Sequence, residues 1–127
     1  MDDLPKLFLL VIWLPASSLA AEIDFSHEIV PVLRKHCVKC HTGDQKKGGF
    51  SLNDRASLLR GGESGPVVVS GKSAESELVA RVTSDDPDLQ MPPEGPRLSA
   101  QEVARLIQWV DEGVAWEPAF SFAKRAY

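Results

Sequence analysis

The sequence has little cysteine, little net charge and no repeats. Only two cysteines occur among its 127 residues, which excludes a disulfide-rich scaffold. The formal net charge is -4, from 18 acidic and 14 basic side chains, which argues against nucleic-acid binding as the main function. No segment sustains the alternation of apolar and polar residues that is typical of a half-buried strand. Length and pattern together predict one domain that is mostly α-helical.

One long apolar stretch is present, at the N-terminus. Residues 7–14 are apolar, and small residues follow them up to Ala21, as in a secretory signal peptide. We expect residues 1–20 to be this leader, cleaved after Ala20. Asp2 and Asp3 make its start less basic than is usual, and a retained membrane anchor is the alternative. Export predicts a periplasmic or equivalent extracytoplasmic location, with membrane attachment only if the leader is retained.

The remaining chain shows helical patterns separated by irregular segments. The patterns predict a first helix with an apolar face from Ile29 up to His36, and later helices over residues 54–60, 74–82 and 99–112. Asp24 and Ser26 are capping residue types ahead of the first helix, Asn53 and Ser73 are the expected caps of the next two, and a capping box over Ser99–Glu102 begins the last. Four prolines within residues 84–98 predict an extended segment there.

The residues with a chemical signature are Cys37-Val38-Lys39-Cys40-His41, a C-x-x-C-H motif. This motif is the attachment signature of c-type haem. Two thiols one helical turn apart can add to the two vinyl groups of a porphyrin, and the adjacent histidine then becomes an axial ligand of the iron. The motif therefore predicts covalent haem c, with Cys37, Cys40 and His41 as binding residues.

Three other interpretations of these residues remain. A thioredoxin-like pair uses the same two cysteines but needs a strand before them, whereas a helix is expected here. A zinc site needs about four ligands, and no second pair accompanies Cys37, Cys40 and His41. A structural disulfide does not need His41. The haem interpretation is favoured because the motif occurs together with an export signal.

The second axial ligand is inferred by elimination. Met91 is the only methionine after the leader, and Pro92 and Pro93 follow it, which keeps the backbone out of a helix. His36 lies beside the attachment cysteines, so we expect its ring not to reach the opposite haem face. His27 is expected to be solvated. Met91 is therefore the predicted sixth ligand of the iron, and a thioether ligand raises the reduction potential.

The motifs together resemble the planctomycete-type cytochrome c domain. The resemblance covers Phe25 to Trp116 and includes the C-x-x-C-H motif, Gly49-Phe50-Ser51-Leu52, Leu59-Arg60-Gly61-Gly62, Met91-Pro92-Pro93 and Leu98-Ser99. It implies an all-α, class-I-like cytochrome c fold with long irregular loops, in which the N- and C-terminal helices pack together around a covalently attached haem. His41 would be the proximal ligand and Met91 the distal one.

The resemblance also bears on domain organisation. It places the cytochrome c domain at residues 21–116, leaving 117–127 as a C-terminal tail or truncated linker. Domains of this family usually belong to larger exported proteins, so downstream domains are one expected partner.

Electron transfer is the function that these residues predict. A His/Met-ligated haem shuttles one electron, and no acid–base pair suited to catalysis is evident near the motif. The alternative is a haem sensor or peroxidase-like enzyme with a displaceable sixth ligand. A redox protein is the expected partner. Four lysines, at positions 35, 39, 46 and 47, lie around the motif and suggest a positive rim that attracts an acidic partner; a merely solvated charged face is the alternative.

Overall fold

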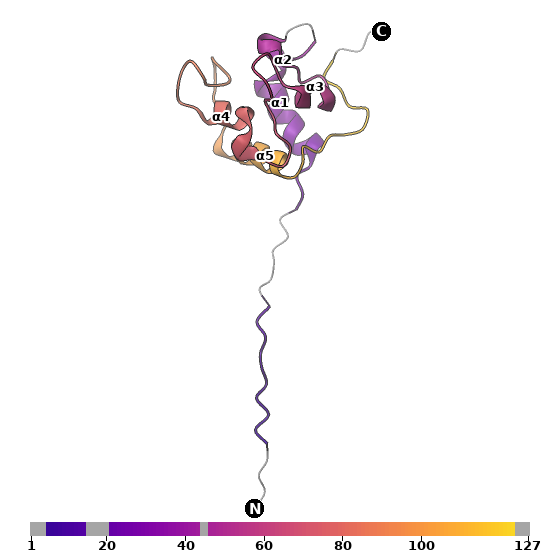
Figure 1. The fold of residues 1–127 in the computed structure, drawn as a ribbon, viewed down its shortest axis with the longest axis vertical. Helices are drawn as coiled ribbons and strands as arrows, with labels where there is room; N and C mark the ends of the chain where they lie inside the picture. Colours follow the sequence, from indigo (N-terminus) through magenta and orange to yellow (C-terminus); the bar gives the residue numbers. More distant parts are fainter. Residues whose placement is uncertain (1–4, 15–20, 44–45, 124–127) are drawn as a thin grey trace, which may run out of the picture.

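A computed structural model describes residues 5–14, 21–43 and 46–123, and these form a helical domain with an N-terminal extension (Figure 1). In chain order its elements are η1 Phe25–Ile29, α1 Val30–His36, α2 Val38–His41, η2 Lys47–Gly49, α3 Arg55–Arg60, η3 Ser73–Glu75, α4 Glu77–Thr83 and α5 Ala100–Asp111. The described residues contain no strand, only an isolated bridge between Gly62 and Gly65. The predicted all-α class agrees with this architecture.

The N-terminal apolar stretch lies apart from the helical domain (Figure 1). Residues 7–14 form no helix, and their side chains are 70–89% exposed. The predicted cleavage point after Ala20 falls outside the described residues. Within the described ranges, no helix has the length and apolar character needed to cross a membrane.

Two predicted helix starts are confirmed by their caps. The Asp24 side chain accepts a hydrogen bond from the backbone N–H of His27 at the start of η1. At α5, the Ser99 hydroxyl accepts from the Glu102 N–H, and the Glu102 carboxylate accepts from the Ser99 N–H. This reciprocal arrangement satisfies two N–H groups that a helix otherwise leaves unpaired.

Two other helix starts were predicted wrongly. Asp54, not Asn53, caps α3, because its carboxylate accepts from the Ser57 N–H at 2.8 Å. The helix expected after Ser73 is a short 3-10 turn, and α4 begins only at Glu77. Between them, the Ser76 hydroxyl donates to the carbonyl of Lys72 and interrupts the helical bonding pattern.

The first and last helices share one core. Ile29 and Leu33 from the first part of the chain, and Leu106 and Val110 from α5, are fully buried in a single cluster. Ile107 of α5 is half-buried. The helical spacing of these residues places them on one face of each helix, so the two helices pack through their apolar faces.

Aromatic side chains fill one part of this core. The ring of Phe25 lies 4.5 Å from that of Trp116 and 6.1 Å from that of Trp109. Phe120 and Phe122 pack edge-on against each other at 4.9 Å, and Phe122 is only 9% exposed. Packing therefore continues beyond Trp116, into the segment that the sequence predicted to be a tail.

Candidate cofactor site

The four predicted site residues line one cavity. Its volume is about 270 Å³, and Cys37, Cys40, His41 and Met91 all contribute to its wall. Met91 is 50 or more positions from the motif along the chain, so the fold is what brings it to the same cavity. The rest of the wall is mainly apolar and includes Phe50, Leu52, Val67, Leu78, Val82, Pro92, Pro93 and Leu98.

The cysteines lie at the junction of two helices. Cys37 ends α1, where its N–H donates to the Leu33 carbonyl at 2.9 Å, and it also precedes α2. Cys40 lies within α2, and its N–H donates to the Cys37 carbonyl at 3.3 Å. Both thiols are free and half-buried. The two cysteines thus line the cavity and do not form a disulfide bond with each other.

The environment of Cys37 favours the neutral thiol. Burial, with smaller effects from the charges of Cys40 and Glu102, raises the pKa of Cys37 to about 12. A thioredoxin-like nucleophile needs the opposite shift, because the thiolate is the reactive form. The thiol-redox alternative is therefore disfavoured by the electrostatics of this site.

His41 has the orientation and protonation state of a metal ligand. Its Nδ1 lies 3.4 Å from the carbonyl oxygen of Phe50, which can only accept, so Nδ1 is the donor. In this tautomer Nε2 carries a lone pair. Burial lowers the pKa of His41 below its ordinary value, against smaller opposing effects of backbone hydrogen bonds. A neutral imidazole oriented by a hydrogen bond at its other nitrogen is the usual form of a metal-binding histidine.

Met91 is held at the cavity by its backbone. Its N–H donates to the carbonyl of Arg81 in α4 at 3.1 Å. Further along the same loop, the guanidinium of Arg97 donates to the carbonyls of Val82 and Ser84, at 3.1 and 2.6 Å. The loop is therefore tied to the end of α4 at Met91 itself and again at Arg97. Met91 is half-buried.

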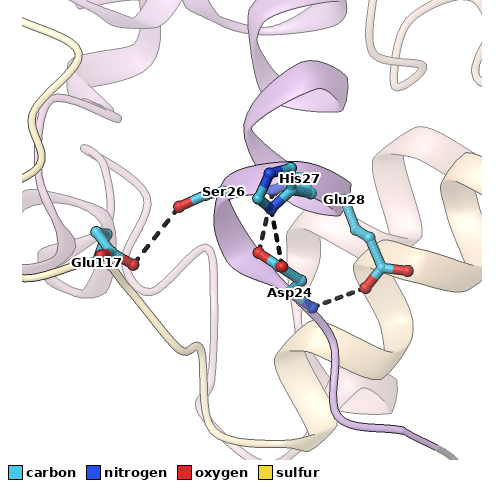
Figure 2. Close-up of polar contacts among 5 residues, drawn as sticks. All are labelled: Asp24, Ser26, His27, Glu28 and Glu117. Atoms are coloured by element: carbon cyan, nitrogen blue, oxygen red, sulfur yellow. Dashed lines mark hydrogen bonds and ion pairs between the residues drawn. The ribbon is translucent and has the colours of Figure 1, made fainter.

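His27 is separated from the cavity. Figure 2 shows its ring against the carboxylate of Asp24, with Nδ1 2.8 Å from Oδ2. The His27 side chain is 85% exposed and is not among the residues that line the cavity. In the same view Ser26 donates to Glu117 from the C-terminal segment at 3.5 Å. His27 therefore belongs to the polar surface near η1, as the sequence predicted.

His36 has a place that sequence reasoning missed. Its ring is 3% exposed and lines the cavity, and its Nε2 lies 3.0 Å from Oε2 of Glu102 in α5. A position next to the attachment cysteine had suggested only that this ring does not reach the opposite haem face. His36 and Glu102 are 66 positions apart in the sequence, so no local pattern predicts their contact.

Two polar side chains also reach the cavity wall from α4. Arg81 and Glu77 are one helical turn apart, and their side chains pair at 2.8 Å. Leu78 and Val82 lie on the same helix at a spacing of four and supply apolar wall. The sequence shows this spacing, which places both side chains on one face of the helix. It does not show whether that face contacts a cofactor or the ordinary core.

A second, more polar hollow adjoins the cavity. Its volume is about 380 Å³, and His36, Cys40, Lys47, Pro92 and Pro93 line both hollows. Lys35, Lys39 and Glu94 complete the charged part of its wall, together with Lys47, whereas Lys46 does not line it. We call this second hollow the lysine groove. It carries three positive charges and one negative charge beside the attachment cysteine.

These residues fit a covalently attached haem. The site supplies two thiols at C-x-x-C spacing, an imidazole with a free Nε2 lone pair, a thioether and a mainly apolar wall. This set matches the chemistry that attachment and axial ligation require. A zinc site has less support, because among the residues described no three His, Cys, Asp or Glu side chains gather closely enough to hold a metal ion.

Comparison with protein families agrees with the motifs. The family model described as planctomycete cytochrome c matches residues 37–95, from the first attachment cysteine to just beyond Met91-Pro92-Pro93. The match confirms the resemblance inferred from the sequence over these residues. No curated protein and no solved structure matches the chain.

Proposed function

We propose, from the membership of residues 37–95 in the planctomycete cytochrome c family, that the chain is an exported electron-transfer domain. The observation that carries this proposal is the single cavity shared by Cys37, Cys40, His41 and Met91. The packing of Ile29 and Leu33 with residues of α5 supports the cytochrome c fold that goes with it.

Each site residue has a distinct role. The thiols of Cys37 and Cys40 would hold the haem through thioether bonds, in which each S–H has added across a vinyl group. His41 would bind the iron through Nε2, with its ring held by the Phe50 carbonyl, and the Met91 sulfur would bind it from the loop anchored on α4. The haem supplies a one-electron iron(III)/iron(II) couple.

The cavity wall favours the reduced form of such a couple. Its side chains are mainly apolar, and Phe50, Leu78 and Val82 are buried. A wall of this kind excludes water and stabilises the extra charge of the oxidised site poorly. Together with the thioether of Met91, it is expected to raise the reduction potential.

The first test is haem staining after denaturing electrophoresis. A covalent haem stays with the chain, whereas a thiol pair or a zinc site gives no stained band.

Spectra of the oxidised protein then test the sixth ligand, since methionine–iron coordination gives a charge-transfer band near the red end of the visible spectrum. Met91→Ala should abolish that band, and Leu89→Ala, an exposed apolar residue of the same loop, should keep it. A band that survives in Met91→Ala would show that another group is the ligand.

A sensor or peroxidase-like module is the second candidate function. The Glu77–Arg81 pair in the cavity wall favours it, because polar side chains near an open iron position can hold peroxide or a diatomic gas. This function requires a displaceable Met91. Rapid binding of carbon monoxide by the reduced protein would support it, and slow or absent binding supports electron transfer.

We further propose that the lysine groove is where an acidic redox partner docks. Its three lysines lie beside Cys40, where the positive field would attract negative charge to the haem edge. The reduced protein should then be oxidised faster by the hexacyanoferrate(III) anion at low than at high ionic strength, with the reverse trend for a cationic cobalt complex. Lys39→Gln should weaken both trends, and Lys72→Gln, paired with Glu75 outside the groove, should not.

Export is the remaining part of the proposal. The exposed apolar side chains of residues 7–14 support a leader that takes no part in the core. The mass of the mature protein tests it: cleavage after Ala20 gives a chain that begins at Ala21. A full-length chain that fractionates with membranes would instead indicate a retained anchor, and a longer product would indicate downstream domains.

A further inference from the structure

The contact between His36 and Glu102 is the most buried charged contact among the described residues. The His36 side chain is 3% exposed and that of Glu102 is 16% exposed, with 3.0 Å between Nε2 and Oε2. The other charged contacts join side chains that are at least 33% exposed. A carboxylate with this exposure is screened less by solvent than those of the exposed ion pairs, so it keeps more of its field.

The Glu102 carboxylate is held in place at both oxygens. Oε1 accepts from the Ser99 N–H at 2.9 Å, and Oε2 contacts the His36 ring. Hydrogen bonds from Ser99 first, and then from His36, keep the pKa of Glu102 below its ordinary value despite burial. The side chain is therefore a fixed negative charge at the N-terminus of α5 under neutral conditions.

This charge acts on the cofactor cavity. His36, which holds the carboxylate, is itself part of the cavity wall and directly precedes Cys37. The charge of Glu102 is also one cause of the raised pKa of the Cys37 thiol, so its field reaches the attachment residue. The imidazole ring of His36 therefore connects the Glu102 carboxylate to the cavity wall.

We propose that Glu102, held by His36, is a potential-setting residue that lowers the reduction potential of the haem. This inference rests on the proposed function. On reduction the iron gains one electron and no bond of the chain forms or breaks. The oxidised site carries one more positive charge than the reduced site, so a fixed negative charge nearby stabilises the oxidised site more.

Other charges around the cavity differ from Glu102. Glu77 also lies in the wall, but its carboxylate pairs at 2.8 Å with Arg81, which is always protonated, so its field is largely cancelled. Lys35, Lys39 and Lys47 of the lysine groove act in the opposite direction, by destabilising the oxidised site. Glu102 and Glu94 of the lysine groove both oppose the field of these lysines, so removal of Glu102 weakens that opposition on the His36 side.

The test is a potentiometric titration of the haem-loaded protein, with dithionite as reductant and hexacyanoferrate(III) as oxidant. Glu102→Gln removes the charge, and glutamine is accepted at this position of a capping box, so the contacts to Ser99 and His36 can persist. We expect the equilibrium constant for reduction to rise by roughly three- to thirtyfold. Glu75→Gln is the matched control: it makes the same change in net charge at an exposed site, 63% accessible, and should leave the potential unchanged.

A second variant covers the case in which Glu102→Gln does not fold. Glu102→Asp keeps the charge but shortens the reach to His36, so its potential should lie between those of wild type and Glu102→Gln. Nitrogen NMR of the reduced protein should show the His36 ring signal displaced in this variant. An unchanged potential in whichever variant folds, or an equal shift in Glu75→Gln, overturns the inference. Absence of a redox-active haem would instead refute the proposed function.

Discussion

The aromatic part of the core and the cofactor cavity are built on different helices and are filled differently. The aromatic part uses η1, α5 and the C-terminal segment, whereas the cavity uses α1, α2 and α4. Around Trp109 the chain fills its own interior: the indole is fully buried, and its N–H donates to the Ala115 carbonyl at 2.7 Å. Around His41 a mainly apolar wall lines a cavity of about 270 Å³. Close packing is the normal state of a protein interior, so a cavity of this size with donor atoms in its wall is suited to holding a large ligand.

This contrast separates two sources of stability. The aromatic cluster contributes through side-chain packing alone. The cavity region contributes fully only when a cofactor occupies it, because unfilled apolar volume forfeits both burial and dispersion contacts. Substitutions in the two regions should therefore have different signatures.

The largest effect is expected from Cys37→Ala combined with Cys40→Ala. Without thioether bonds the haem is no longer retained, and the folded state loses the stabilisation that the bound group provides. We expect no haem-stained band and a fall in Tm of about 10 °C or more by circular dichroism. Lys39→Gln, between the two cysteines, should keep haem and Tm. Equal Tm values for wild type and the double variant would contradict a cavity completed by its cofactor.

Trp109→Ala should be the most damaging change in the aromatic cluster. It removes a fully buried side chain and a hydrogen bond, so we expect the free energy of unfolding to fall by about 3–5 kcal/mol. The haem-stained band should persist, since no attachment residue changes. Urea unfolding measures the loss, and Trp109→Phe, which keeps a ring, should lose less. A loss below about 1 kcal/mol would mean that the cluster is not tightly packed.

A chain that ends at Trp116 should lose less. It lacks Phe120 and Phe122, whose rings close the aromatic cluster, and the bond from the Phe122 N–H to the Asn53 carbonyl at 2.8 Å. The expected loss is about 2–4 kcal/mol in urea unfolding, with the haem retained. Glu117→Gln, at an exposed position, serves as the control. Unchanged stability would support residue 116 as the end of the domain, as the sequence predicted.

The smallest effect concerns two acidic caps, one in each region. The folded-state pKa values of Asp24 and Glu102 are both lowered, by hydrogen bonds from His27 and Ser99 respectively. Each cap therefore stabilises the fold above the ordinary pKa of its carboxyl and loses this effect as pH falls through the lowered pKa. Thermal unfolding from about pH 5 down to pH 2.5 should show less acid destabilisation in Glu102→Gln than in Asp24→Asn, because Asp24 is solvent-screened. An equal change in both variants would contradict this ranking.

Local patterns predicted much of this molecule. The C-x-x-C-H motif, the capping box at Ser99 and the single methionine of the domain are each readable within a few residues. Errors arose where two neighbouring residues had similar tendencies. Asn53 and Asp54 both suit a helix cap, and a bond to the Ser57 N–H decides between them.

Other features have no local signature. Phe120 and Phe122 follow no helical period, so nothing in their neighbourhood predicts that they are packed. The Phe50 carbonyl that selects the tautomer of His41 belongs to an irregular segment, and backbone acceptors carry no sequence signal.

The sequence by itself determined the chemistry of this protein: two thiols, an imidazole and a thioether, with the spacing that haem attachment needs. Only the tertiary structure decided which distant groups surround them. It brings Met91 to the motif through the anchored loop on α4, and it joins Glu102 to His36 across 66 positions. The physical reason is that spacing along a helix is a local property, whereas contact between remote residues depends on how the whole apolar core packs.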